Sequence, residues 1–242
     1  MLYKFTIWSV ATPLLALGMA LPAGADTETF GGLPAGTVIG GALPWGGFTD
    51  GFGLFPGIRV KSVTNNDGPH TAILFDSSNP SVADDFDLGT PNASCGGPGI
   101  GSGGQVGAPG QNCLPYHNLV IIAEDLEDKN SDNIVDYPDD DGDGGTLEFE
   151  FARPVSSVRV VLVDVDSETV YAQITNKDGS IRVHAVDLGD NSVQTLQLAG
   201  IGTFRQLEVV LSGSGAVAEI GYGLGPVSVE ENSWGAVKAR YR

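Results

Sequence analysis

The segment between residues 127 and 145, EDKNSDNIVDYPDDDGDGG, carries carboxylates at the spacing that calcium loops use. Calcium takes six to eight oxygen ligands, which a flexible loop supplies from alternate positions. With Asp128 as position 1, oxygen-bearing side chains fall at positions 3, 5, 9 and 12, and a backbone carbonyl falls at position 7. The predicted metal ligands are Asp128, Asn130, Asp132, Ile134 through its carbonyl, Asp136, Asp139, Asp141 and Asp143. The sequence therefore predicts one calcium site here, or two adjacent ones.

The pattern resembles the calcium loops of EF-hands, dockerins and thrombospondin type 3 repeats, in which the residue at the place of Val135 points inward. It differs from them at Asn133, where glycine is usual, and at Asp139, where glutamate is usual. Asparagine tolerates the left-handed backbone conformation better than most residues. A solvated acidic loop, the usual role of a charge run, and a site for another cation remain alternatives.

Two further groups of acids follow no single calcium template. The loop between residues 75 and 92 contains Asp76, Asp84, Asp85 and Asp87, for which a binding role and ordinary turn chemistry are both open. Asp164, Asp166 and Glu168 alternate with apolar residues, which indicates either a solvent-facing side of a strand or part of a site.

Catalytic signatures are absent from the sequence. The three histidines, His70, His117 and His184, are far apart, and no serine lies in a G-x-S-x-G elbow. A pair of carboxylates for glycoside hydrolysis stays open as a third reading of the function, although no pair stands out. The sequence therefore predicts a protein that is not an enzyme.

Aromatic side chains interleave with glycine near the amino terminus, at Trp45, Phe48, Phe52 and Phe55. They could stack on sugar rings, or they could pack in the core or along a strand edge. The sequence leaves both roles open.

The first 25 residues have the layout of a secretory signal peptide. Lys4 precedes an apolar run, and small residues at Ala23 and Ala25 form a cleavage site. Pro13 and Gly18 interrupt the run, which disfavours the alternative of a transmembrane anchor. We expect cleavage near Ala25, no transmembrane segment in the mature chain, and a secreted, periplasmic or cell-surface location.

The only two cysteines, Cys95 and Cys113, flank a glycine-rich segment. In an exported protein such a pair most simply forms one disulfide, and no CxxC spacing indicates a metal or catalytic thiol. The formal net charge of −18 disfavours nucleic acid as a partner, because phosphate binding needs clustered Lys and Arg. The expected partners are Ca²⁺ and either polysaccharide or other copies of the chain.

Short apolar runs separated by Gly, Pro, Asn and Asp predict strands and turns. Strands are expected near residues 58–64, 71–75, 118–123, 145–154, 156–166, 169–176, 181–188, 192–199, 204–212 and 216–223. Lys177-Asp178-Gly179 and Gly189-Asp190-Asn191 are predicted hairpin turns. About ten strands at this spacing predict an all-β fold, a single antiparallel, jelly-roll-like β-sandwich with long Gly- and Asp-rich loops.

One domain is expected over residues 26–230, followed by a basic tail over residues 231–242. The tail carries Lys238, Arg240 and Arg242. A disordered end and a docking or sorting tag are both open for it.

Several motifs in order, LPAGTVIG, AILFDSSNP, DFDLGTPN, GGPGIGSGG, NLVIIAED, PDDDGDGGTLEFEF and VSSVRVVLVDVD, resemble a group of uncharacterised exported bacterial proteins. Many of that group carry PEP-CTERM-type sorting tails, a motif that this sequence lacks. The resemblance implies a secreted β-sandwich with a calcium-dependent acidic loop region, and it implies no activity. The predicted function is a calcium-binding, non-enzymatic matrix, adhesion or carbohydrate-binding module. The alternative is a subunit of a filament or surface layer that assembles by strand pairing.

Overall fold

The computed structural model describes residues 25–44, 46–51, 53–64, 68–80, 85–165 and 167–225. The predicted signal peptide up to residue 24 and the predicted basic tail lie outside these residues, as do Trp45, Phe52, Asp84 and Asp166. Within the described part of the chain, no helix is long and apolar enough to cross a membrane.

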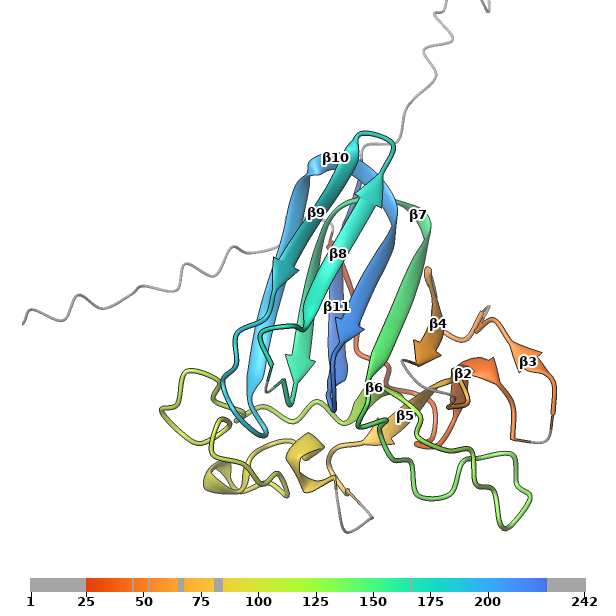
Figure 1. The fold of residues 1–242 in the computed structure, drawn as a ribbon, viewed down its shortest axis with the longest axis vertical. Coiled ribbons are helices and arrows are strands. Elements are labelled where there is room, and N and C mark those ends of the chain that lie inside the picture. The colour runs from red at the N-terminus through yellow and green to blue at the C-terminus, as the bar shows by residue number, and fades with distance from the viewer. Residues whose placement is uncertain are drawn as a thin grey trace, which may run out of the picture.

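The described chain is built from antiparallel strands, which confirms the predicted all-β sandwich (Figure 1). Its only helices are two short 3-10 turns, η1 (Phe86–Leu88) and η2 (Ala93–Cys95). The strands are β1 (Ala25–Glu28), β2 (Val38–Ala42), β3 (Phe48–Thr49), β4 (Ile58–Thr64), β5 (Ala72–Asp76), β6 (Asn118–Ile122), β7 (Gly145–Val163), β8 (Tyr171–Asn176), β9 (Gly179–His184), β10 (Val193–Leu211) and β11 (Ala216–Leu224).

Two of these strands are longer than the sequence predicts. The pairs of strands expected at 145–154 and 156–166, and at 192–199 and 204–212, are each one continuous strand, β7 and β10. Strand β7 leaves its pairing with β4 at Phe151 and begins pairing with β11 at Val155. Pro154 lies between these points, where a residue without an N–H interrupts neither ladder. The breaks in the apolar pattern therefore mark bends rather than strand ends.

Because β7 and β10 bend together, they contribute to both layers of the sandwich. One layer has the order β4-β7-β10-β8-β9, and the other has the order β2-β5-β6-β11-β7-β10. The main core fills the space between the layers. Its largest fully buried side chains include Phe30, Phe149, Phe151, Leu74, Leu147 and Leu162.

The second layer is buried on its outer face as well, so that all five residues of β6 are buried. A second apolar cluster on this face joins Ile73 and Ile121 of the sheet to Leu88 and Val135 of the long loops. Val135 thus points inward, as predicted. Figure 1 shows the loops between β5 and β6 and between β6 and β7 gathered at the lower end of the sandwich. The packed apolar side chains hold these loops against the sheet.

One of the two predicted hairpins is wrong. Strands β8 and β9 pair around Lys177 and Asp178, as expected. Strand β10 pairs with β7 and β8 rather than β9, so residues 189–191 form a connection and not a hairpin turn. Asn191 is fully buried there, with a φ of 60°. Its side chain donates hydrogen bonds inside the molecule, and the turn-like local sequence does not predict these contacts.

Candidate metal centre

Carboxylates from two loops far apart in the sequence meet at the lower end of the sandwich. Asp85 directly precedes η1, and Asp139 and Asp140 lie shortly before β7. One oxygen of each lies within 4.8 Å of one oxygen of the others. In the described ranges this is the one group of three metal-ligating side chains that is so compact, and it is called the buried cluster below.

The two aspartates before β7 are positioned by the end of β6. The N–H of Glu124 donates to the carbonyl of Asp139 at 3.1 Å, and Asp140 forms an isolated bridge with Ala123. The backbone therefore runs on beside β6 as a short, fixed extension of the sheet. The Asp140 side chain is buried, and its Oδ2 accepts a hydrogen bond of 2.8 Å from the N–H of Gly215.

Asp85 reaches the same place from the other loop. The N–H of Leu88 donates to the Asp85 carbonyl at 3.1 Å, and Leu88 is fully buried against the sheet. The Asp85 residue is 8% exposed, and its Oδ2 has no hydrogen-bond partner in the described chain. A buried carboxylate without a partner is costly unless it binds a proton or a cation.

The pKa values of the cluster show that its carboxylates resist ionising together. Burial, followed by the negative charges of Asp140 and Asp139, raises the pKa of Asp85 to about 8. Burial raises the pKa of Asp140 to about 6, although the hydrogen bond from Gly215 opposes the shift. The charge of Asp139 is the largest cause of a raised pKa at Glu124. A cation among these oxygens would remove the repulsion.

Asp164 and Asn191 brace the loop that carries Asp85. The Asn191 side chain donates to the carbonyls of Asp87 and Gly89 at 2.5 and 2.7 Å. The Asn191 N–H donates to Asp164 Oδ1 at 2.6 Å. Burial, followed by the charge of Asp87, raises the pKa of Asp164 to about 7. The residues after β7 and before β10 thus fix the position of the residues that follow Asp85.

The sequence leaves Asp164, Asp166 and Glu168 as either a solvent-facing side of a strand or part of a site, and the structure decides against the first role for Asp164. Its φ of 58° ends β7 at Val163, and its side chain is buried rather than solvent-facing. The alternation of apolar and acidic residues is therefore not that of an exposed strand face at this position.

The donor set of the buried cluster fits a hard cation. All three side chains offer oxygen, and no described cysteine or histidine lies among them. Oxygen-only sites suit Ca²⁺, Mg²⁺ or Mn²⁺, whereas zinc and copper favour nitrogen and sulfur ligands. The unpartnered Oδ2 of Asp85 is the observation that distinguishes this group from an ordinary acidic surface. The cluster can hold a metal ion.

The predicted calcium loop is divided in the structure. Asp139 joins the buried cluster, whereas Asp128, Asn130, Asp132, Ile134 and Asp136 lie in an exposed or half-exposed turn, called the outer loop below. Asp128 accepts hydrogen bonds from the N–H groups of Asp132 and Asn133 at 3.2 and 3.0 Å. Asp136 accepts one from the N–H of Lys129 at 2.8 Å. The outer-loop carboxylates thus already have backbone partners.

The backbone of the outer loop is left-handed at Asn133. Asn133 has a φ of 69°, the left-handed conformation expected where glycine is usual. Asp141 and Asp143 lie beyond the loop, where Asp141 Oδ1 accepts a hydrogen bond of 2.9 Å from the N–H of Asp143. Their role as metal ligands stays a prediction, as does that of the outer loop.

Asp85 and Asn191 are the residues whose roles the sequence does not single out. Asp85 lies in the acidic loop for which the sequence leaves a binding role open. Asp76, an acid of the same segment, instead ends β5 and accepts a hydrogen bond from the N–H of Ser78 in the turn that follows. The packing of Leu88 on the sheet brings Asp85 to the cluster, and Asp87 lies near enough for its charge to raise the pKa of Asp85 and of Asp140. Sequence spacing cannot supply that contact.

The described aromatic residues considered for sugar stacking, Phe48 and Phe55, differ in exposure. Phe55 is buried and meets the ring of Phe30 edge-on at 5.3 Å, so it belongs to the core. Phe48 is 68% exposed on β3. Of the described aromatic residues proposed for sugar stacking, Phe48 alone has a ring open to a ligand.

The predicted disulfide between Cys95 and Cys113 is present, with the two Cα atoms 5.3 Å apart. Between the two cysteines, Asn112 donates to the Gly89 carbonyl at 3.0 Å and to the Asn191 carbonyl at 3.3 Å. Asn92 donates to Asn191 Oδ1 at 2.7 Å. The disulfide loop is thereby fastened to the same end of the sandwich as the buried cluster.

Comparison with known proteins identifies no family for this chain. No family model matches the chain, and no curated protein sequence matches it. A solved structure described as "CpGH89CBM32-4 (seleno-methionine labeled) produced by Clostridium perfringens" aligns with 39% of this chain and 88% of its own. Its sequence identity is 10% and its TM-score is 0.23, which is too low to support an argument about function.

Proposed function

We propose that this chain is an extracellular, calcium-stabilised β-sandwich that acts as a binding module without catalysis. The observation that carries the calcium proposal is the buried carboxylate of Asp85, whose Oδ2 has no hydrogen-bond partner in the described chain, beside Asp139 and Asp140. Three carboxylates at an irregular buried site favour Ca²⁺ over Mg²⁺, which demands near-ideal octahedral geometry and keeps several waters. The disulfide is consistent with an oxidising, extracellular setting.

In this proposal calcium acts on structure rather than on a substrate. The ion would replace protons on the buried cluster and tie the loop after β5 to the segment before β7. Both loops also contact the outer face of the sheet through Leu88 and Val135. Calcium would therefore order one whole end of the sandwich. The outer loop is a second, weaker calcium site in the proposal, because its carboxylates already accept backbone hydrogen bonds.

Thermal unfolding with buffered free calcium tests the proposal. Calcium at about 100 times its Kd should raise the Tm of the protein by roughly 5–10 °C. The Asp85→Asn variant should lose most of this rise, because it removes one of the three charges. Asp178→Asn is the matched control, since Asp178 is an exposed acid in the β8–β9 turn at the other end of the sandwich.

Asp139→Asn is a second variant in case Asp85→Asn does not fold. A full calcium response in both folded variants would place the tight site elsewhere. Loss of the response in Asp178→Asn as well would indicate a general effect of charge. Either result would contradict the proposal.

A second candidate function is assembly by strand pairing. Strand β9 ends the sheet order, and its partner is β8 alone among the described strands. The amino-terminal segment that could be donated between copies is already paired within the chain, β1 with β11 and β2 with β5. Light scattering over a range of protein concentrations separates the candidates, since a binding module stays monomeric and an assembly subunit does not.

A further inference from the structure

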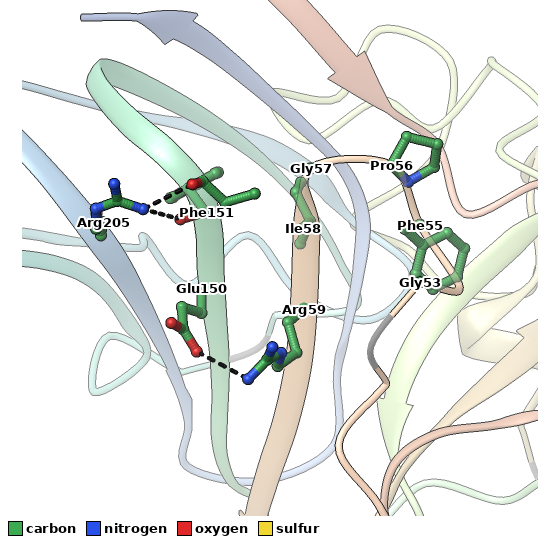
Figure 2. Close-up of a pocket in the computed structure, with 10 residues that line it drawn as sticks. Gly53, Phe55, Pro56, Gly57, Ile58, Arg59, Glu150, Phe151 and Arg205 are labelled. Carbon is green, nitrogen blue, oxygen red and sulfur yellow. Dashed lines mark hydrogen bonds and ion pairs between the residues drawn. The ribbon is translucent and has the colours of Figure 1, made fainter.

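A groove of about 460 Å³ lies where β7 passes from one layer to the other. This volume falls within the range of about 300–1,000 Å³ that is usual for small-molecule sites. Figure 2 shows Arg205, Glu150 and Arg59 along one side of the groove and the turn with Phe55 and Pro56 on the other. The groove is remote in the fold from the buried cluster, whose residues do not line it.

The position of Arg205 follows from the bend in the two long strands. The β7–β10 register shifts on both sides of Phe204, and such an irregularity redirects the next side chain. Arg205 Nη1 donates to the carbonyls of Phe151 and Ala152 at 3.3 and 2.7 Å. These contacts hold the guanidinium at the groove and use only one of its nitrogens. Arg205 makes no ion pair with any carboxylate in the described chain.

Beside Arg205, the groove presents an ion pair that both donates and accepts hydrogen bonds. Arg59 and Glu150 are cross-strand neighbours on β4 and β7, and Arg59 Nη1 lies 3.6 Å from Glu150 Oε2. Their side chains are 31% and 45% exposed, so a ligand can reach both. Pro56, exposed on the turn before β4, supplies apolar surface at the groove, while Phe55, Ile58 and Phe151 lie buried behind it.

The charge of the groove is opposite to that of the whole chain. Its lining contains two arginines and one carboxylate, whereas the chain has a formal net charge of −18. An adjoining hollow shares Pro56, Gly57 and Ala152 with the groove and is lined by Arg153 and Asp26, whose charges balance. Arg153 also has no ion pair among the described residues. An anionic group can therefore pair with Arg205, on a chain whose net charge is otherwise strongly negative.

We propose that this groove binds a carboxylate-bearing saccharide, with the ligand carboxylate on Arg205 and neighbouring hydroxyl groups on Arg59 and Glu150. A guanidinium fork matches a carboxylate with two parallel hydrogen bonds. A sugar acid also carries hydroxyl groups that donate and accept close to its carboxylate, as the ion pair requires. The face of its ring can pack on Pro56. An acidic peptide has the charge but lacks the hydroxyl groups.

This inference rests on the proposed role as a binding module and specifies its ligand class and site. It does not depend on calcium at the buried cluster. The calcium test and the saccharide test can therefore fail separately.

Binding to tri-galacturonate, to its methyl ester and to tri-glutamate tests the inference, after a screen of neutral and carboxylated glycans. All titrations use the full chain at one fixed free calcium concentration. The acid form of the saccharide should bind, and the ester, which has the same rings without the charge, should bind at least about tenfold more weakly. Tri-glutamate should bind no better than the ester.

Arg205→Gln should weaken the acid form by about tenfold or more and leave the ester unchanged. Arg182→Gln is the matched control, because Arg182 is an exposed arginine that lies over the Tyr171 ring on β8. Arg205→Lys should restore only part of the binding, since it keeps the charge and loses the fork. Equal effects of Arg205→Gln and Arg182→Gln would overturn the site.

Two results would overturn the ligand class. If only neutral glycans bind, the proposed role as a binding module would stand, but the proposal that the ligand carries a carboxylate would be wrong. Binding of tri-glutamate as tightly as tri-galacturonate would show recognition of charge without the sugar. The absence of binding to every carboxylated glycan in the screen would overturn the inference, while the calcium proposal would stand on its own titration.

Discussion

The buried cluster and the outer loop are both rich in aspartate, yet their chemistry differs. In the outer loop the carboxylates accept hydrogen bonds from backbone N–H groups, and the side chains are exposed or half-exposed. In the buried cluster Asp85 has an oxygen without a partner, and the pKa of Asp85 and of Asp140 is raised. The pKa of Asp85 reaches about 8, so that at neutral pH a calcium ion would have to displace a proton from this carboxyl group.

The difference shows that the spacing of acids and their need for a cation are separate properties. The outer loop has the spacing of a calcium loop, and its own backbone N–H groups donate hydrogen bonds to its carboxylates. The buried cluster has no sequence spacing to recognise, because its members come from two loops. Burial makes their negative charge costly, and no lysine or arginine in the described chain forms an ion pair with them. A metal prediction from sequence is sensitive to the first property, whereas binding energy depends on the second.

The largest expected effect is on the pH dependence of calcium binding. The folded pKa of Asp85 is about 8 and that of Asp140 about 6, against 3.8 for the ordinary side chain. The metal-free folded state therefore keeps protons that the unfolded chain loses, so its stability falls as pH rises from about 4 to about 8. Calcium binds the deprotonated cluster, and its affinity should rise by at least about tenfold between pH 6 and pH 8.

Calorimetric titration of the metal-free protein with calcium, at pH 6 and pH 8 in buffers of different ionisation enthalpy, measures both the affinity and the protons released. The Asp85→Asn variant should release fewer protons and show a smaller fall in metal-free Tm with pH. An affinity that is constant between pH 6 and pH 8 would remove the distinction between the buried cluster and the outer loop.

A smaller effect is expected from two asparagines with the same backbone conformation. Asn191 and Asn133 have φ values of 60° and 69°. Asn191→Ala should lower the free energy of unfolding by about 2–3 kcal/mol. It leaves the buried Gly89 carbonyl and the Asn92 side chain without the hydrogen bonds that Asn191 makes to them. Asn133→Ala removes an exposed side chain and should cost about 1 kcal/mol or less, from the left-handed backbone alone.

Urea unfolding in the presence of a chelator measures both values without the contribution of calcium. Similar losses in the two variants would mean that the end of the sandwich near the buried cluster is no more dependent on its polar contacts than the outer loop is.

The smallest effect is expected at Asp132. Its Oδ1 accepts a hydrogen bond of 2.9 Å from the N–H of Ile134, which an asparagine oxygen can also accept. Asp132→Asn should therefore change the calcium-induced rise in Tm by less than about 2 °C. Differential scanning calorimetry at saturating calcium is the measurement, with Asp85→Asn measured in parallel. A larger loss in Asp132→Asn than in Asp85→Asn would make the outer loop the principal site.

Local patterns predict the fold well because each strand depends on its own alternation of apolar residues. The alternation that puts Phe149 and Phe151 on one side predicts the strand at 145–154, and both residues are buried in the core. The sequence predicts strand ends where β7 and β10 bend, because Pro154 and the glycines near residue 200 give the same local signal in either case. Only the pairing with two different neighbours distinguishes them.

The candidate site was predictable only in part. Asp139 was expected as a ligand and does belong to the buried cluster. Its companion Asp85 comes from a loop whose path is determined by Leu88 packing on the sheet and by Asn191 holding the carbonyls of Asp87 and Gly89. The Asn191 contacts join residues about a hundred positions apart, and no local spacing encodes either them or the packing of Leu88.

The most direct test of the central claim is anomalous scattering from crystals of the protein grown or soaked with Tb³⁺, a lanthanide that replaces calcium at oxygen sites. The account predicts the strongest peak within bonding distance of Asp85, Asp139 and Asp140. A strongest peak among Asp128, Asp132 and Asp136, with none at the buried cluster, would contradict it.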